Sequence, residues 1–224
     1  MNKKYQVLVS FVSFFSCITF CNQINAQAFK KGSLLVSITE GWTTANYTTR
    51  DINSPVPTTL AEGEVGGIRD PLIIEYGLTN KFGIGLSSGT DVFKVNPSRF
   101  YNFRIPGNEA AEVKTSELTF DLNYHYMVTK KLDLSAFTSL GVFSVAFEGS
   151  KDDFKYKYEA TGGIVRFGTK ARYYVYKRFG VMGMASLFSG SGTPDKEKRN
   201  TIGNAYSTNL TGYAFELGLC FRFF

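Results

Sequence analysis

The chain has few cysteines and histidines for its length. Its 224 residues include three cysteines and one histidine, and Cys17 and Cys21 both lie near the start. Cys220 is then the one cysteine left for the folded part, which excludes an internal disulfide and a Cys/His zinc site. Glycine-rich phosphate loops and EF-hand patterns are missing as well. We therefore expect no metal site and no cofactor.

The chain has one long apolar run, and it lies near the start. Lys3 and Lys4 precede an apolar run at residues 5–21, and Ala26 and Ala28 follow it. This order is typical of a cleaved secretory signal peptide. We expect cleavage after Ala26 or Ala28, with residues 1–26 as the signal peptide and 27–224 as the mature domain. A membrane anchor helix is the rival interpretation, but the run is at the short limit of about 17 residues; a lipoprotein is a third, but no lipobox precedes either early cysteine.

A strong charge of one sign is also missing. The formal net charge is +6 at pH 7, and loss of Lys3 and Lys4 with the signal peptide would lower it to +4. This small, scattered excess does not predict nucleic-acid binding. A mean hydropathy of −0.10, without a second long apolar run, excludes a helical inner-membrane protein.

Aromatic residues and glycine are abundant: 21 Phe, 13 Tyr and 22 Gly. Bulky apolar residues recur at every second position, which is the β-strand period. We predict eight such strands, at residues 33–42, 72–78, 82–88, 118–126, 132–142, 165–175, 179–188 and 213–223. Short turns follow the second, fourth and sixth strands, whereas longer polar segments follow the others, at residues 43–70, 90–114, 148–161 and 189–207.

The last predicted strand has two unlike faces. Its apolar positions are Tyr213, Phe215, Leu217, Leu219, Phe221 and Phe223. It resembles the C-terminal strand of outer-membrane β-barrels, with the aromatic motif displaced by one residue from Phe224. The chain thus resembles the small OmpA/OmpX-type, porin-family barrels of Gram-negative bacteria. The resemblance implies an all-β fold, an eight-stranded antiparallel up-and-down transmembrane β-barrel, in contact with outer-membrane lipid and inserted by the barrel-assembly machinery, with no appended periplasmic domain.

The short turns and long segments of such a barrel lie on opposite sides of the membrane, with the short turns in the periplasm. A soluble lipocalin is also an eight-stranded barrel and would turn its apolar face inward. The terminal aromatic and the nearly charge-free apolar face weigh against this alternative.

With the apolar face on lipid, eight charged residues would face the lumen: Glu75, Asp121, Asp133, Arg166, Lys170, Arg172, Glu216 and Arg222. In a narrow barrel such groups must pair or hydrate. We expect a salt-bridged plug, and the alternative is an ion-conducting gate. Asp121, Lys170 and Glu216 should lie at similar heights.

The segment 90–114 mixes bases with aromatic residues: Phe93, Lys94, Arg99, Phe100, Tyr101, Phe103 and Arg104. These residue types suit lipopolysaccharide phosphates, an anionic glycan or a protein partner, although a self-packed hairpin explains them equally well. Catalysis is not expected, because His125 lies at the short-turn end without a His-x-Ser pattern and is better explained as a hydrogen-bonded lumen residue. The predicted function is a non-enzymatic structural or surface-binding barrel; a narrow channel for ions or small solutes is the alternative.

Overall fold

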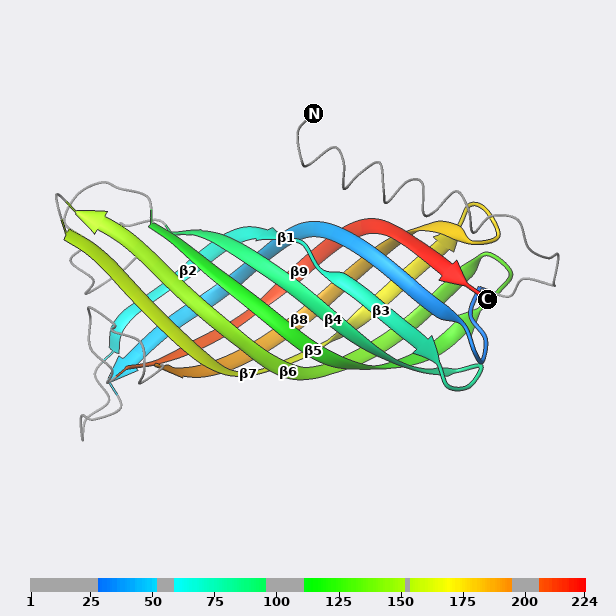
Figure 1. Ribbon diagram of the computed structural model, residues 1–224, viewed down its shortest axis with the longest axis horizontal. Coiled ribbons are helices and arrows are strands. Elements are labelled where there is room, and N and C mark those ends of the chain that lie inside the picture. The colour runs from blue at the N-terminus through cyan, green and yellow to red at the C-terminus, as the bar shows by residue number, and fades with distance from the viewer. Residues whose placement is uncertain (1–27, 52–58, 96–110, 152–153, 195–205) are drawn as a thin grey trace, which may run out of the picture.

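The computed structural model describes residues 28–51, 59–95, 111–151, 154–194 and 206–224. Its nine strands are β1 (Leu34–Asp51), β2 (Thr59–Arg69), β3 (Leu72–Gly77), β4 (Phe82–Val95), β5 (Ala111–Val128), β6 (Leu132–Lys151), β7 (Phe154–Tyr174), β8 (Phe179–Pro194) and β9 (Tyr206–Phe223). Figure 1 shows them tilted around one long axis. The described residues form no helix that is long and apolar enough to cross a membrane. The predicted signal peptide, residues 1–26, lies outside the described residues.

The nine strands occupy eight positions around a closed barrel. β2 and β3 both pair with β1 on one side and β4 on the other. They are separated only by Asp70 and Pro71, and proline has no backbone N–H with which to continue a ladder. Antiparallel pairing of β1 with β9 closes the sheet. The predicted eight-stranded antiparallel barrel is thus confirmed.

The strands are strongly staggered around the barrel. Starting at Leu34 of β1, the paired residues on successive strands are Tyr76, Ile84, Leu122, Thr138, Phe167, Leu187 and Tyr213, and the path returns to β1 at Thr44. The return point is 44 − 34, or 10, residues further along the same strand. This stagger sets the strand tilt, and it decides which inward side chains meet across the lumen.

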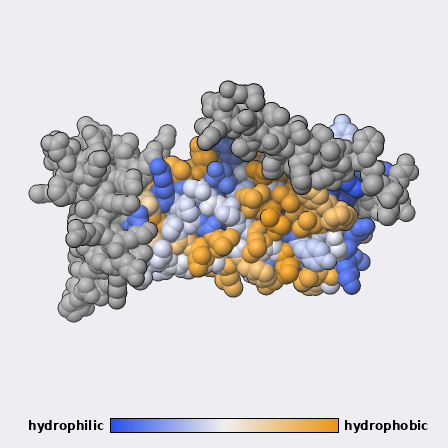
Figure 2. All heavy atoms as spheres, in the orientation of Figure 1, coloured by the Kyte–Doolittle hydropathy of each residue, from blue (hydrophilic) through white to orange (hydrophobic). Residues whose placement is uncertain are grey.

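The apolar face of the strands points outward. Leu122, Leu140 and Phe215 are all more than half exposed, whereas the alternate residues Asp121, Ser139 and Glu216 are almost fully buried. Figure 2 shows the resulting apolar surface along the barrel wall, nearer the end with the short turns. The inward-facing apolar arrangement of a lipocalin is therefore not the one adopted.

The strands are longer than predicted. β6 has 20 residues and β7 has 21, and each of the four segments expected to be loops contains strand residues. β2 in particular lies within the expected loop 43–70. The strand extensions that were not predicted also alternate between apolar and polar residues, but here the apolar residues face the lumen. Ala45, Tyr47 and Leu210 point inward and are buried, while polar residues point outward. A prediction based on apolar residues on the lipid-facing side could not identify these extensions as strand.

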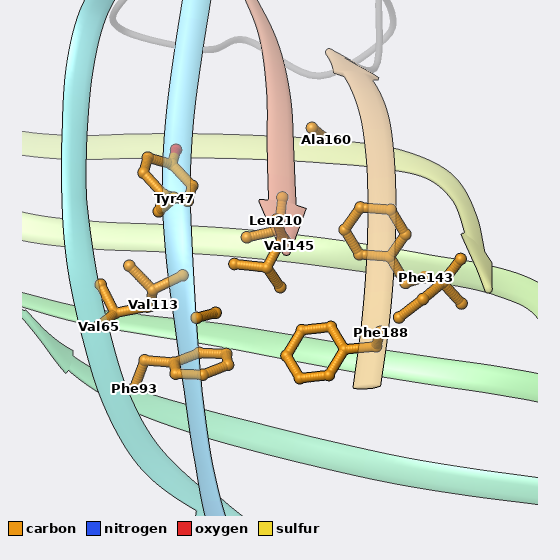
Figure 3. Close-up of a cluster of buried hydrophobic side chains, with 11 residues drawn as sticks. Tyr47, Val65, Phe93, Val113, Phe143, Val145, Ala160, Phe188 and Leu210 are labelled. Carbon is orange, nitrogen blue, oxygen red and sulfur yellow. The ribbon is translucent and has the colours of Figure 1, made fainter. Parts of the chain in front are cut away.

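The inward apolar side chains of these extensions form a core within the barrel, at the end away from the short turns. This far-end core, drawn in Figure 3, comprises Ala45, Tyr47, Val65, Phe93, Val113, Phe143, Val145, Ala160, Ile164, Phe188 and Leu210. Each of these residues is at most 5% exposed. Their burial against one another stabilises the strands beyond the outward apolar belt, the apolar part of the outer wall that includes Leu122, Leu140 and Phe215. This stabilisation explains why the strands are so long.

The short-turn end is closed by the segment that precedes β1. Ala28 and Phe29 are fully buried, and the Ala28 N–H donates to the Thr129 carbonyl at 2.8 Å. Gly32 donates to the Gly77 carbonyl, also at 2.8 Å. A side chain at Gly77 would come within 2.5 Å of the Lys30 carbonyl oxygen, so this glycine permits the close approach of the segment.

Candidate functional site: the charged lumen

A ring of four ionisable side chains lies near the short-turn end. His125 of β5 contacts Asp133 Oδ1 through Nδ1 at 2.6 Å and Glu75 Oε1 through Nε2 at 2.7 Å. Arg172 of β7 donates to the second oxygen of each carboxylate, at 3.0 Å to Asp133 and 2.5 Å to Glu75. Each carboxylate therefore bridges the same two nitrogen-bearing side chains. We call Glu75, His125, Asp133 and Arg172 the lower ring.

Lys170 occupies the middle of the lumen. Its ammonium group donates to Asn123 Oδ1 at 2.9 Å and to Asp121 Oδ2 at 3.3 Å, and it lies 4.4 Å from the centre of the Phe137 ring. Ser87 also donates to Asp121 Oδ2, at 2.5 Å. The lysine is thus held by a carboxylate, an amide and an aromatic face, as a buried cation requires.

Arg69 organises a second set of charges towards the far end. Its Nη1 donates to Asp91 at 3.1 Å and its Nε donates to Glu216 at 3.0 Å, while its Nη2 donates to Glu117. Three carboxylates from three other strands therefore converge on one guanidinium group. The planar fork of arginine suits it to bridge several acids at once.

Arg166 completes this set. Its Nε and Nη2 both donate to Glu117 Oε2, at 3.0 and 2.7 Å, and its guanidinium carbon lies 4.3 Å from the centre of the Phe188 ring. Phe188 belongs to the far-end core, so the charged layer rests directly on the apolar layer. We call Arg69, Asp91, Glu117, Arg166 and Glu216 the upper cluster.

All eight residues predicted to face the lumen are at most 5% exposed. Lys170 meets Asp121 as expected from their heights, but Glu216 instead accepts from Arg69 and from the Thr39 hydroxyl at 2.8 Å. Arg222 donates to the Lys177 carbonyl and faces the Tyr174 ring.

Sequence reasoning missed three members of the upper cluster. Arg69 and Asp91 lie in segments expected to be loops, and Glu117 lies one residue before a predicted strand. The signal that could have found them was the alternation itself, because Glu117, Thr119 and Asp121 share one face of β5. His125, weighed as a catalytic residue, has its two ring nitrogens occupied by carboxylates.

Most of the residues predicted to bind a partner in segment 90–114 lie outside the part of the chain that the structure describes. Arg99, Phe100, Tyr101, Phe103 and Arg104 lie outside the described residues. The Lys94 backbone pairs with Glu112 in the β4–β5 ladder, so this position is strand rather than loop, and the neighbouring Phe93 points into the far-end core.

The chemistry of these side chains is that of ion pairing. A buried carboxylate or guanidinium group is costly unless it is paired, and here each one in the lower ring and the upper cluster has a charged partner. Within the described ranges, no set of three His, Cys, Asp or Glu side chains could hold a metal ion. The members of the lower ring and the upper cluster come from β2–β7 and β9, which these ion pairs join across the lumen.

No protein-family model and no curated protein matches the chain. Among solved structures, the outer-membrane protein OprG from Pseudomonas aeruginosa aligns with a TM-score of 0.51 and 14% identity, covering 90% of this chain and 99% of OprG. The outer-membrane protein AlkL, determined in DMPC bilayers, aligns with a TM-score of 0.51 and 13% identity, covering 92% and 95%. At these identities the likeness concerns the fold. The chain has the fold of the small outer-membrane β-barrels.

Proposed function

We propose that this protein is a non-enzymatic, non-conducting barrel of a Gram-negative outer membrane that binds a partner at its extracellular end. The observation that carries the proposal is the filled lumen. Paired charges occupy its middle, an apolar core occupies one end, and the Ala28–Phe29 segment occupies the other. A solute could pass only if several buried ion pairs opened together.

The reversal of the alternation supports a position in the membrane. In β9, Phe215 and Tyr213 are exposed on the outer wall, whereas Leu210, which lies closer to the far end, points inward and is buried. Such a reversal is expected where the surroundings of the barrel change from hydrocarbon to water. The short turns would then lie in the periplasm, and the strand extensions would stand above the outer leaflet. Export by a cleaved signal peptide and insertion by the barrel-assembly machinery complete this proposal.

The extracellular partner is proposed from the sequence. Lys94, Arg99 and Arg104 offer charge, and Phe100, Tyr101 and Phe103 offer aromatic faces, which suit lipopolysaccharide, an anionic glycan or a protein. The extensions support this role physically, since a closed barrel with its own apolar core is a rigid base for the connections it carries.

Planar-bilayer recording on the refolded mature protein tests the proposal. We expect no stepwise current from the parent. A Phe29→Ala, Arg172→Ala, Arg69→Ala, Phe188→Ala variant, which truncates one side chain in each of the short-turn seal, the lower ring, the upper cluster and the far-end core, should conduct more than the parent and serves as the positive control. Stable stepwise currents from the parent would instead establish the narrow channel.

A further inference from the structure

Basic residues surround the short-turn end of the barrel. Each of the three short turns carries one or two of them, and the segment before β1 carries two more. We call these seven bases the basic rim: Lys30, Lys31, Lys81, Lys130, Lys131, Lys177 and Arg178. No aspartate or glutamate occurs in the segments that carry them, residues 28–33, 78–82, 127–132 and 175–179. Even with a free carboxylate on Phe224, the rim keeps an excess of 7 − 1, or 6, positive charges.

The basic rim is exposed, whereas the acids beside it are not. Five of its seven bases are exposed, and the other two, Lys30 and Arg178, are partly exposed. Glu75 and Asp133, which flank these segments in the sequence, are buried in the lower ring. Beyond the opposite edge of the apolar belt, the exposed charges include both signs: Glu64, Arg50 and Lys114. The short-turn end therefore differs from the far end in carrying an excess of one sign.

The backbone fixes the position of the last base in each short turn. Its carbonyl oxygen accepts a hydrogen bond from a backbone N–H of the next strand around the barrel. These bonds run from His125 to Lys81 at 2.7 Å, from Tyr174 to Lys131 at 2.7 Å and from Arg222 to Arg178 at 2.8 Å. The short turns recur at every second strand, so neighbouring turns are about 10 Å apart across the sheet. The bases are thus distributed around the rim at a regular spacing.

Two of the short turns also have the same internal hydrogen bonds. The Thr79 hydroxyl oxygen accepts from the N–H groups two and three residues further on, at 3.1 and 2.9 Å. The Thr129 hydroxyl oxygen does the same in its own turn, at 3.3 and 2.9 Å. A threonine that bonds to its own turn in this way stabilises the turn. Lys81 and Lys131 therefore occupy equivalent, well-defined positions.

The basic rim lies directly at the edge of the outward apolar belt. Lys81 precedes Phe82 and Lys177 follows Tyr176, and both of these aromatic residues are more than half exposed. Figure 2 shows hydrophilic residues at this end, next to the apolar surface. Lysine side chains beside an aromatic girdle extend their ammonium groups to the level of the lipid headgroups. In the proposed membrane position, these are the headgroups of the periplasmic leaflet.

We propose that the basic rim binds the phosphate groups of anionic phospholipids in the periplasmic leaflet. Phosphate oxygens accept charge-assisted hydrogen bonds from lysine and arginine. Each base near an anionic membrane surface strengthens binding about fivefold, which corresponds to about 1 kcal/mol. The aromatic residues beside the rim pack against the acyl chains of the same lipids. Because the turns are short, they keep the bases at the membrane surface, which favours a lipid over a periplasmic polymer such as peptidoglycan.

This inference rests on the proposed membrane position and concerns the opposite end of the barrel from the extracellular partner. It does not depend on whether the lumen conducts. Conductance tests the proposed function, and lipid retention tests the basic rim, so that the two proposals can fail separately.

The experiment compares two double variants of the full mature protein in mixed vesicles. One carries Lys81→Gln and Lys131→Gln, which remove two charges from the rim and keep the backbone carbonyls that anchor the turns. The matched control carries Arg50→Gln and Lys114→Gln, which remove two exposed charges beyond the other edge of the belt. The vesicles contain phosphatidylcholine and phosphatidylglycerol with the same acyl chains. Native mass spectrometry measures which lipids each protein retains after extraction into a neutral detergent.

We expect the parent and the control variant to retain phosphatidylglycerol in preference to phosphatidylcholine. The rim variant should lose about fivefold or more of that preference. Equal losses in the two variants would overturn the proposal, as would a parent that retains both lipids equally. Barrel closure of each variant is verified by its resistance to unfolding in detergent before lipids are compared.

Sedimentation with purified peptidoglycan tests the other anionic partner. We expect the parent and the rim variant, both in neutral detergent, to remain in the supernatant. Sedimentation of the parent but not of the rim variant, without a difference in lipid retention, would overturn the phospholipid as the ligand and assign the rim to the cell wall.

Discussion

The Phe29 and His125 rings stack face to face, with their centroids 3.4 Å apart and their planes 9° from parallel. This contact joins the segment before β1 to the lower ring, and therefore joins the short-turn seal to the charges behind it. His125 in turn lies between Asp133 and Glu75. Substitutions at Phe29 therefore test the short-turn seal, and measurements on His125 test the lower ring.

Phe29→Ala should lower the free energy of unfolding by about 3 kcal/mol, the usual cost of truncating a buried phenylalanine. Urea titration of the protein in vesicles measures the change. Lys31→Ala is the matched control, because Lys31 lies in the same segment but is exposed, and it should change stability by less than about 0.5 kcal/mol. Equal effects of the two variants would mean that Phe29 does not seal the barrel.

The ring of His125 should carry a proton on both nitrogens at pH 7. A neutral imidazole has one N–H and could donate to only one of the two carboxylates that contact its nitrogens. Because the chain has a single histidine, nitrogen NMR of histidine-labelled, untagged protein reports this residue alone. Observation of a neutral tautomer would contradict the hydrogen-bonding pattern of the lower ring.

Lys170→Met should destabilise the barrel by about 3 kcal/mol or more, because it leaves Asp121 as a buried charge without its cation. Methionine keeps the apolar stem that packs beside Phe137, so packing loss is small. Adding Asp121→Asn should recover part of the lost stability. A double-mutant cycle measured by thermal unfolding tests this, and strict additivity of the two changes would show that the residues are not coupled.

Leu122→Arg should destabilise the folded barrel by about 2 to 4 kcal/mol, the cost of a charge near the middle of the lipid-facing surface. Ser144→Arg, also outward but beyond the reversal of the alternation, should be nearly neutral. Unfolding titrations in vesicles measure both. The opposite ranking would place the lipid boundary elsewhere on the wall.

Trp42 provides an optical test of the same boundary. It is the single tryptophan of the chain and points outward at the edge of the apolar belt. Lipids brominated close to the headgroup should quench its fluorescence more strongly than lipids brominated near the chain ends. Absence of quenching by either lipid would mean that this part of the wall is not in the membrane.

Much of the fold can be predicted from the sequence because alternation is a local property. Leu118, Phe120 and Leu122 fix one face of β5 as apolar, and Thr119 and Asp121 fix the other, whatever the rest of the chain does. The number of barrel positions followed from such segments, and so did the inward direction of the eight charged residues. Terminal aromatic positions such as Phe223 indicated the class of barrel.

Tertiary structure decided which inward side chains meet. The pairing of Arg172 with Glu75, 97 residues apart, depends on the stagger around the closed barrel, which no single strand encodes. The strand lengths were decided in the same way, because Tyr47, Phe93 and Leu210 hold the extensions together only once they share a lumen. Phe29 closes the short-turn end for the same reason: its partner, His125, comes within reach only after the barrel has formed.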